Sequence, residues 1–142
     1  MATWVVPGDY AAVRAALDVS LTTEVLPDDV IGLDLYVGAA ERDVRYADPL
    51  ADTYVGENAE RIKAAAILLT AAYLAPAIPR LSSERLADYQ YSQQAVDWNA
   101  LAAHLRARAR QELAAISSTD VAASVALRHP AFARASGTRG TW

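Results

Sequence analysis

Apolar residues recur at intervals of three and four along most of this chain, a spacing that predicts amphipathic α-helices. The first such stretch covers residues 10–17, with Val13 and Leu17 on one face. Asp9 directly precedes it and is expected to act as the N-cap, because a carboxylate there accepts hydrogen bonds from unpaired amides of the first turn. A short first helix is therefore predicted.

A second, longer helix is predicted from Pro27 to Asp48. Pro27 and the two aspartates after it favour the first turn of a helix. Asp48 ends this helix, because a residue that precedes a proline is pushed out of the helical conformation. The apolar face of this helix contains Val30, Leu33, Val37, Ala40 and Val44, and its other faces contain Asp34, Glu41, Arg42 and Arg45. Gly32 and Gly38 lie inside it, at a cost of about 1 kcal/mol each relative to alanine. We expect these glycines to mark the close approach of a neighbouring helix.

A third helix, at residues 59–75, is apolar on almost all sides. Between Ala64 and Leu74 only two side chains are polar, yet this run is shorter than the roughly 20 residues that a bilayer requires. We therefore expect a central helix that its neighbours bury. Pro76 and Pro79 are expected to close it.

A last long helix is predicted from its N-cap, Asp97, to Ile116. Its apolar stripe contains Trp98, Leu101, Leu105, Ala109, Leu113 and Ile116, whereas His104, Arg106, Arg108 and Arg110 lie away from that stripe. The preceding segment, residues 81–94, is ambiguous, since its serine pair fits a helix cap but residues 89–92 alternate as in a strand. We expect an extended segment or a hairpin there.

These elements define the expected fold class, which is mainly α. It is a small bundle of four helices, the first of them short, with an extended or hairpin segment between the last two. A length of 142 residues fits one domain, and an alanine-rich composition that is 54% hydrophobic favours closely packed helices. We assign residues 1–116 to the helical domain and residues 117–142 to an extended C-terminal arm.

The predicted arm combines arginines with aromatic residues. Its characteristic side chains are Arg128, Phe132, Arg134, Arg139 and Trp142, whereas segments that remain disordered contain few aromatics. We expect these residues to form an interface that orders against a partner protein. The alternative is an ordinary flexible tail.

Charge is divided unevenly along the chain. Residues 1–60 carry a net charge of −9 and residues 61–142 a net charge of +5, although the whole chain carries only −4. If the two halves occupy different faces, acidic and basic faces of adjacent copies can pair, and such contacts close into rings. The candidate residues for this pairing are Asp34, Glu41 and Asp43 on the acidic side and Arg106, Arg108 and Arg110 on the basic side. The other interpretation is an uneven but fully solvated surface.

The sequence contains no set of residues with catalytic or metal-binding spacing. It has no cysteine, and His104 and His129 have no carboxylate at helical ligand spacing. It has no G-x-S-x-G, P-loop or G-x-G-x-x-G motif. Asp28 and Asp29 need no catalytic role, because carboxylates in the first turn of a helix are stabilised by the helix dipole. We therefore expect no enzyme activity, no metal and no cofactor. The N-terminus lacks a signal-peptide pattern, which favours synthesis in the cytoplasm.

The main alternative is a small DNA-binding packaging or regulatory protein. Arg106, Arg108 and Arg110 gather on one helix, and arginine contacts phosphate. However, the chain is acidic overall, and the cluster is not placed as in a helix-turn-helix motif. Salt bridges to an acidic neighbour explain the same arginines.

Four blocks of the sequence resemble the head-tail connector (adaptor) proteins of long-tailed, non-contractile phages. The blocks are LPDDVIGLDLYVGAAERDVR at residues 26–45, the alanine-rich stretch 59–75, SERLADYQYS at residues 83–92, and VDWNAL at residues 96–101. The likeness covers roughly residues 8–116, most of the chain. One position departs from the family pattern, because a glycine is common before the Asp-Tyr pair where this chain has Ala87. The turn geometry at that point does not carry over.

The resemblance implies a helical protomer of a phage virion that assembles, often as a dodecamer, into a ring beneath the portal at the capsid vertex. Its partners would be the portal protein above and a stopper or tail-completion protein below. DNA would pass through the central channel, and no membrane would be involved. By analogy, the arm from Ser117 to Trp142 would dock on the portal.

Overall fold

The computed structural model describes residues 4–18, 21–83 and 97–128. Within these residues the chain is mainly helical and contains no strand, which confirms the predicted small helical bundle. The main helices are α1 (Tyr10–Leu17), α3 (Ala39–Ala47), α4 (Glu57–Leu74) and α7 (Trp98–Arg128). The shorter helical segments are Pro7–Asp9, α2 (Asp28–Ile31), Asp34–Gly38, Ala51–Thr53, Ala75–Ala77 and α5 (Ile78–Ser83).

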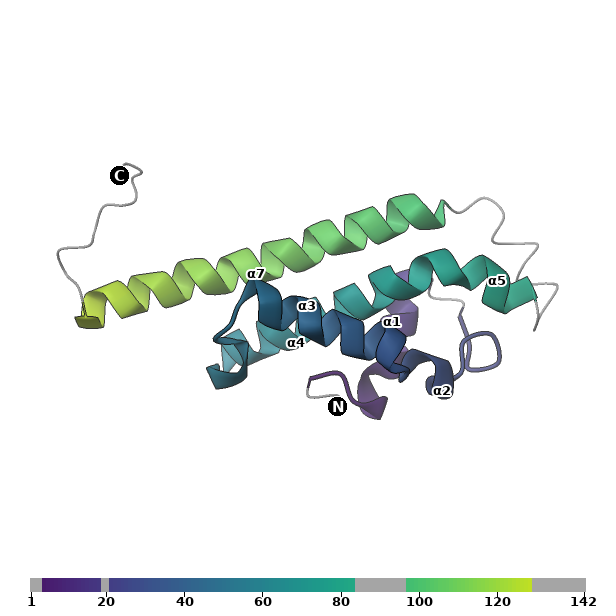
Figure 1. Ribbon diagram of the computed structural model, residues 1–142, viewed down its shortest axis with the longest axis horizontal. Helices are drawn as coiled ribbons and strands as arrows, with labels where there is room; N and C mark the ends of the chain where they lie inside the picture. The colour runs from purple at the N-terminus through teal and green to yellow at the C-terminus, as the bar shows by residue number, and fades with distance from the viewer. Residues whose placement is uncertain (1–3, 19–20, 84–96, 129–142) are drawn as a thin grey trace.

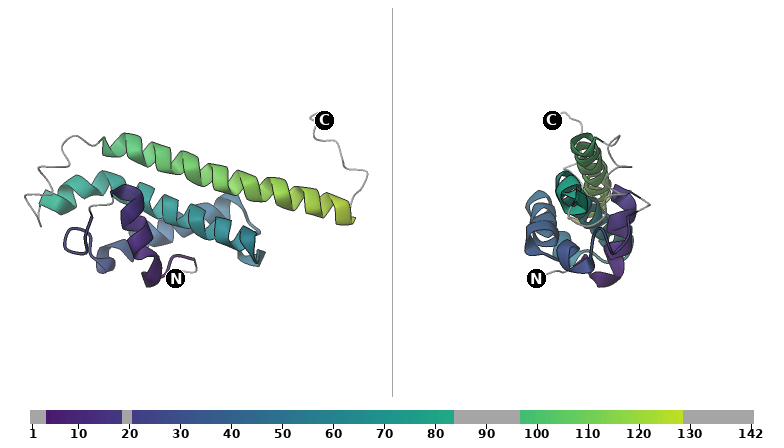
Figure 2. Two further views of the ribbon diagram at one scale, coloured as in Figure 1. Left: turned by 180° about the vertical axis from the view of Figure 1, so that it is seen from behind. Right: turned by 90° about the vertical axis from the view of Figure 1, so that its right-hand side faces the viewer.

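Helix α4 lies in the middle of the bundle. Helix α7 runs antiparallel along one side of it, and α1 and α3 pack against α4 on the side away from α7, one on each flank (Figures 1 and 2). The buried residues of α4 are Ile62, Ala65, Ala66, Leu68, Leu69, Thr70, Ala71, Ala72 and Leu74. The alanines among them let the neighbouring helices approach closely, and the larger side chains fill the space between those helices.

The apolar character of α4 follows from its central position. The helical run Glu57–Arg80 is long and apolar enough to cross a membrane. In the bundle, however, 67% of the most apolar 18-residue stretch of this run is buried by the rest of the chain. Burial by neighbouring helices therefore accounts for this composition, as the sequence predicted.

The prediction of a continuous helix from Pro27 to Asp48 is wrong, because the helix is interrupted after α2. Leu33 adopts an extended conformation, with φ −65° and ψ 144°, and a π-helical turn at Asp34–Gly38 then leads into α3. This interruption resets the helical phase. Val37, Ala40 and Val44 are buried as predicted, but Leu33 is 50% exposed.

The two glycines of this region behave differently. A Cβ atom at Gly32 would lie 2.7 Å from the hydroxyl oxygen of Tyr10 in α1, so the predicted close approach of a neighbouring helix is confirmed there. A Cβ at Gly38 would instead collide with the carboxylate of Asp34, which belongs to the same turn. The prediction for Gly38 is therefore wrong.

Asp9 occupies the N-cap position of α1, but its side chain does not cap that helix. Its Oδ2 atom accepts a hydrogen bond from the amide of Val6 at 3.0 Å and forms an ion pair with Nζ of Lys63 at 3.1 Å. The predicted capping bond is thus wrong. Asp9 instead closes the preceding Pro7–Asp9 turn and ties it to α4.

The prolines after α4 do not end the helical path. The α-helix stops at Leu74, but the chain continues through the 3₁₀ turn Ala75–Ala77 into α5. Each proline stands in the first turn of its segment, where its lack of an N–H group costs no hydrogen bond of that segment. Residues 81–83 are consequently helical, which corrects the prediction of an extended segment or hairpin there. The rest of that predicted segment, residues 84–94, lies outside the described residues.

The start of α7 is as predicted, but its end is not. The Oδ1 atom of Asp97 accepts a hydrogen bond from the Ala100 amide at 3.0 Å, which confirms the N-cap. The helix continues beyond Ile116 to Arg128, so residues 117–128 are helical and not an extended arm. Figure 1 shows this end of α7 projecting past the rest of the bundle. Four predicted arm residues, Phe132, Arg134, Arg139 and Trp142, lie outside the described residues.

Candidate partner interface beside the last helix

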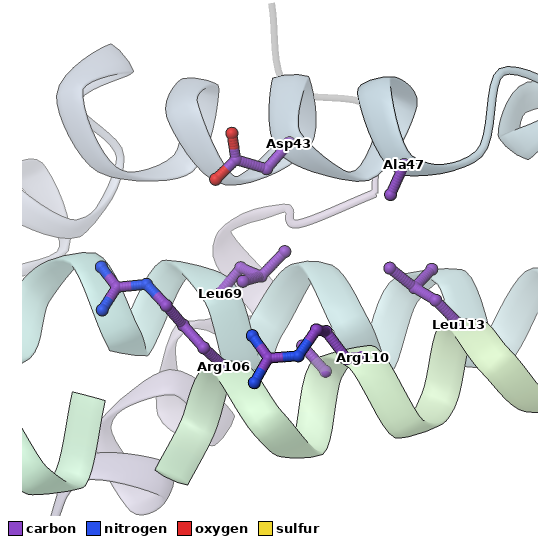
Figure 3. Close-up of a pocket in the computed structure, with 7 residues that line it drawn as sticks. Asp43, Ala47, Leu69, Arg106, Arg110 and Leu113 are labelled. Atoms are coloured by element: carbon purple, nitrogen blue, oxygen red, sulfur yellow. The ribbon is translucent and has the colours of Figure 1, made fainter. Parts of the chain in front are cut away.

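A groove lies between α3 and α7, with α4 as its floor. Its cavity measures about 190 Å³. The residues that line it are Asp43 and Ala47 from α3, Leu69 from α4, and Arg106, Ala109, Arg110 and Leu113 from α7 (Figure 3). We call this the α3–α7 groove. It has an apolar floor, two guanidinium groups on its α7 side and one carboxylate on its α3 side.

Tyr73 orders the charged groups at one end of this groove. Its hydroxyl donates a hydrogen bond to Oδ2 of Asp43, and the guanidinium carbon of Arg106 lies 5.5 Å from the centre of its ring. The hydrogen bond to Asp43, together with burial, raises the pKa of Tyr73 above its ordinary value. The phenol therefore stays protonated and keeps Asp43 in place.

Within the described part of the chain neither arginine forms an ion pair, but Arg106 lies over the Tyr73 ring whereas Arg110 makes no such ring contact. Its side chain is exposed and lies along the same groove. With two arginines against the single carboxylate of Asp43, the α3–α7 groove has a net positive charge. Such a groove favours an occupant that brings a carboxylate.

The three arginines predicted as one cluster are divided between the two flanks of α7. At 3.6 residues per turn, Arg106 and Arg110 are about 40° apart around the helix, whereas Arg108 is about 160° from each. Arg108 lines a second, shallower hollow of about 350 Å³ together with Glu112 and alanines of α1 and α4. The structure therefore brings only two of the three arginines together.

All three predicted acidic residues are engaged within the chain, Asp43 through its hydrogen bond from Tyr73. Glu41 is only 1% exposed, and its Oε2 accepts hydrogen bonds from the amides of Trp4 at 2.7 Å and Val5 at 3.0 Å. Its predicted role in pairing between copies is thus wrong, because a buried carboxylate cannot reach another molecule. Asp34 is exposed and forms an ion pair with Arg42 of its own chain at 3.1 Å.

Two leucines near α2 form an exposed apolar turn that sequence reasoning missed. Leu33 is 50% exposed and Leu35 is 66% exposed, and they flank Asp34. We call Leu33–Leu35 the leucine turn. The signal for it was Gly32, because a glycine within an apolar helical pattern also fits an interruption, after which the following leucine need not face the core.

In the part of the chain whose side chains the structure describes, the other exposed large apolar residues are Val6, Tyr46, Leu50 and Val55. Tyr46 is the most exposed of them, at 91%. Leu50 is close in sequence to Asp52, whose two carboxylate oxygens are held by Arg45 at 3.0 and 3.3 Å. Asp52 is therefore paired within the chain, as Asp34 is.

Within the residues that the structure describes, no three His, Asp or Glu side chains come together as metal ligands. No family model, curated protein or solved structure matches this chain. The candidate interface accordingly rests on its geometry and charge.

Proposed function

We propose that this protein is a head-tail connector, a non-enzymatic structural protein of a phage virion that forms a ring below the portal and joins the capsid to the tail. In this proposal the portal protein and a stopper or tail-completion protein are its partners, and DNA passes through the channel of the ring. The observation that carries the proposal is the placement of the two oppositely charged parts of the chain on different sides of α4.

The first part of the chain, with a net charge of −9 over residues 1–60, supplies α1, α2 and α3. Helix α7, which carries Arg106, Arg108 and Arg110, packs on the other side of α4 from α1 and α3 (Figure 2), and Arg106 and Arg110 border the groove between α7 and α3. A subunit with an acidic side and a basic side can contact a like neighbour through unlike surfaces, and repeating such a contact gives a ring where the rotation between neighbours closes. This arrangement supports a protein whose role is assembly.

The projecting end of α7 supports a second contact, with the portal. Helix α7 continues beyond Ile116 to Arg128, and this end projects past the other helices (Figure 1). A helix that runs past its own core is available to a partner. We propose that residues 117–142 make the contact with the portal ring.

Two truncations test this proposal together with the full-length protein. One chain ends at Ile116 and the other at Arg128, and both retain the buried residues of the bundle. Far-UV circular dichroism should show a folded helical protein in each case. Electron microscopy with portal rings encoded by the same genome should show a connector ring for the full-length chain and none for the chain that ends at Ile116.

The chain that ends at Arg128 shows whether the projecting helix or the final segment makes the contact. Normal ring formation by the chain that ends at Ile116 would remove the proposed portal contact. Failure of the full-length protein to join any portal ring would count against the connector function itself. A salt-dependent gel shift with DNA under the same conditions would favour the DNA-binding alternative.

The DNA-binding alternative has weaker support from the arrangement of the arginines. Arg106 contacts Tyr73, and Arg108 lies on the other flank of α7 from Arg110. A phosphate backbone is bound by several cations on one surface. Three arginines that point to two different flanks do not form such a surface.

A further inference from the structure

The leucine turn is a rigid, exposed apolar feature with acidic neighbours. The amides of Tyr36 and Val37 donate hydrogen bonds to the carbonyl of Leu33 at 2.9 and 3.0 Å, and both of these residues are buried. The backbone of the turn is therefore anchored in the core while Leu33 and Leu35 face solvent. Because this backbone is already held, a partner that covers the turn has to order only the leucine side chains and not the loop.

The acids near the leucine turn are free to change partners. Asp29 is exposed and has no ion-pair partner among the described residues. Asp34 pairs with Arg42, but both side chains are mostly exposed, at 71% and 63%. Ion pairs this exposed contribute little to stability, so Asp34 can exchange Arg42 for another arginine at small cost.

The α3–α7 groove offers the complementary chemistry. Its apolar floor is formed by Leu69, Ala109 and Leu113, and Arg106 and Arg110 border it. Its volume of about 190 Å³ is below the roughly 300–1,000 Å³ of sites for small molecules. A groove of this size and charge admits one or two apolar side chains that arrive with a carboxylate.

We propose that copies of this chain join when the leucine turn of one copy inserts into the α3–α7 groove of the next. A leucine covers the apolar floor, and Asp34 of the inserted turn pairs with Arg110. This inference rests on the proposed function, since it names the contact by which the proposed ring forms. The turn and the groove are different surfaces, so each copy gives one and receives one, and the contact propagates from copy to copy.

The other exposed apolar side chains fit this groove less well. Tyr46, Leu50 and Val55 are separated from one another in sequence, and none of them is directly next to an acidic residue. Among the exposed apolar side chains that the structure describes, only those of the leucine turn stand directly on both sides of an exposed carboxylate, that of Asp34. Charge complementarity thus selects it as the occupant.

The absence of cysteine from the sequence makes disulfide trapping a direct test. Leu35→Cys and Leu113→Cys are prepared as separate full-length proteins, and an equal mixture is oxidised and separated by size without reductant. The expected product is a covalent dimer that contains one chain of each kind. A mixture of Val55→Cys and Leu113→Cys is the matched control, because Val55 is also apolar and exposed, at 82%.

A chain that carries both Leu35→Cys and Leu113→Cys distinguishes a ring from a pair. A contact that propagates should give a ladder of covalent oligomers. A product that stops at two copies would overturn the propagating contact, because it would mean that two molecules exchange their leucine turns reciprocally. Circular dichroism of each variant establishes that the helical fold is retained.

Charge reversal tests the ion pair within the same assay. Arg110→Glu should lower the yield of the trapped dimer by about tenfold, since like charges then face each other. Arg108→Glu makes the same change on the other flank of α7 and should leave the yield within about twofold. Combining Asp34→Arg on the cysteine-bearing turn with Arg110→Glu on the cysteine-bearing groove should restore the dimer.

The proposal is overturned if Leu35→Cys gives no more dimer than Val55→Cys, or if Arg108→Glu and Arg110→Glu act equally. These outcomes are separable from failure of the connector function. Rings on the portal without trapping would reject this contact and leave the function in place. A trapped ladder without portal binding would support this contact and count against the connector function.

Discussion

Replacement of Glu41 by alanine should be among the most destabilising single changes in the described bundle. Glu41 is 1% exposed and accepts hydrogen bonds from the amides of Trp4 and Val5. A buried donor that loses a charged acceptor costs about 1.5–3 kcal/mol. Val5 is fully buried, so water cannot replace the hydrogen bond that its amide loses. Trp4 is half-buried, so water can replace part of the hydrogen bond that its amide loses. Removing the carboxylate also recovers some of its desolvation cost.

We therefore expect Glu41→Ala to lower the free energy of unfolding by about 2–4 kcal/mol, a large part of the total of about 5–15 kcal/mol typical of a domain. Glu41→Gln keeps an acceptor but removes the charge, and it should cost only about 1 kcal/mol. Urea unfolding followed by far-UV circular dichroism measures both values, provided that the slope with denaturant is unchanged.

Glu60→Ala is the matched control, because Glu60 is exposed and has no ion-pair partner in the described residues. Its effect should stay within about 0.5 kcal/mol. A loss below about 1 kcal/mol for Glu41→Ala would refute the reasoning. Such a result would mean that the N-terminal segment is not held to α3 by this carboxylate.

Further predictions concern backbone conformation and pH. Gly32→Ala should lower the free energy of unfolding by about 1–3 kcal/mol, because the added Cβ would lie 2.7 Å from the Tyr10 hydroxyl oxygen. Adding Tyr10→Phe should recover part of that loss, as measured by urea unfolding. Gly56→Ala should cost about 1–3 kcal/mol from backbone strain alone, since Gly56 has φ 66° and a Cβ there would meet no atom within 4 Å, whereas an unchanged unfolding midpoint would contradict this. The pKa of Tyr73 is raised, first by its hydrogen bond to Asp43. This raised pKa contributes stability that is complete below the ordinary tyrosine pKa of about 10. The stability is lost as pH rises through the pKa of Tyr73 in the folded protein. Tyr73→Phe should therefore be less stable near neutral pH and lose less stability in alkali, and equal alkaline losses in the two proteins would argue against this account.

Local patterns in the sequence were sufficient where a helix depends on its own residues. The range 10–17, the central helix and the N-cap at Asp97 were all predicted, because periodicity and capping involve residues only a few positions apart. The buried positions Val37, Ala40 and Val44 were predicted for the same reason. Of the candidate site, the presence of arginines outside the apolar stripe of the last helix was visible in the sequence.

The fate of individual polar and apolar side chains required the path of the whole chain. Nothing near Glu41 in sequence indicates that Trp4 and Val5 lie beside it, yet their amides decide that this carboxylate is buried. Leu33 faced the core in the helical pattern, but an interruption beside Gly32, where α1 approaches, turned it outward. Distant segments set both outcomes.

The sequence by itself thus determined a mainly helical bundle, its central apolar helix and its uneven charge, because these properties follow from composition and from spacing along a helix. Only the tertiary structure decided that Arg110 borders an apolar groove with Asp43, and that the leucine turn is exposed on an anchored backbone. The physical reason is that burial and pairing depend on which elements the fold brings together across tens of residues, whereas helix formation is governed by contacts within a single turn.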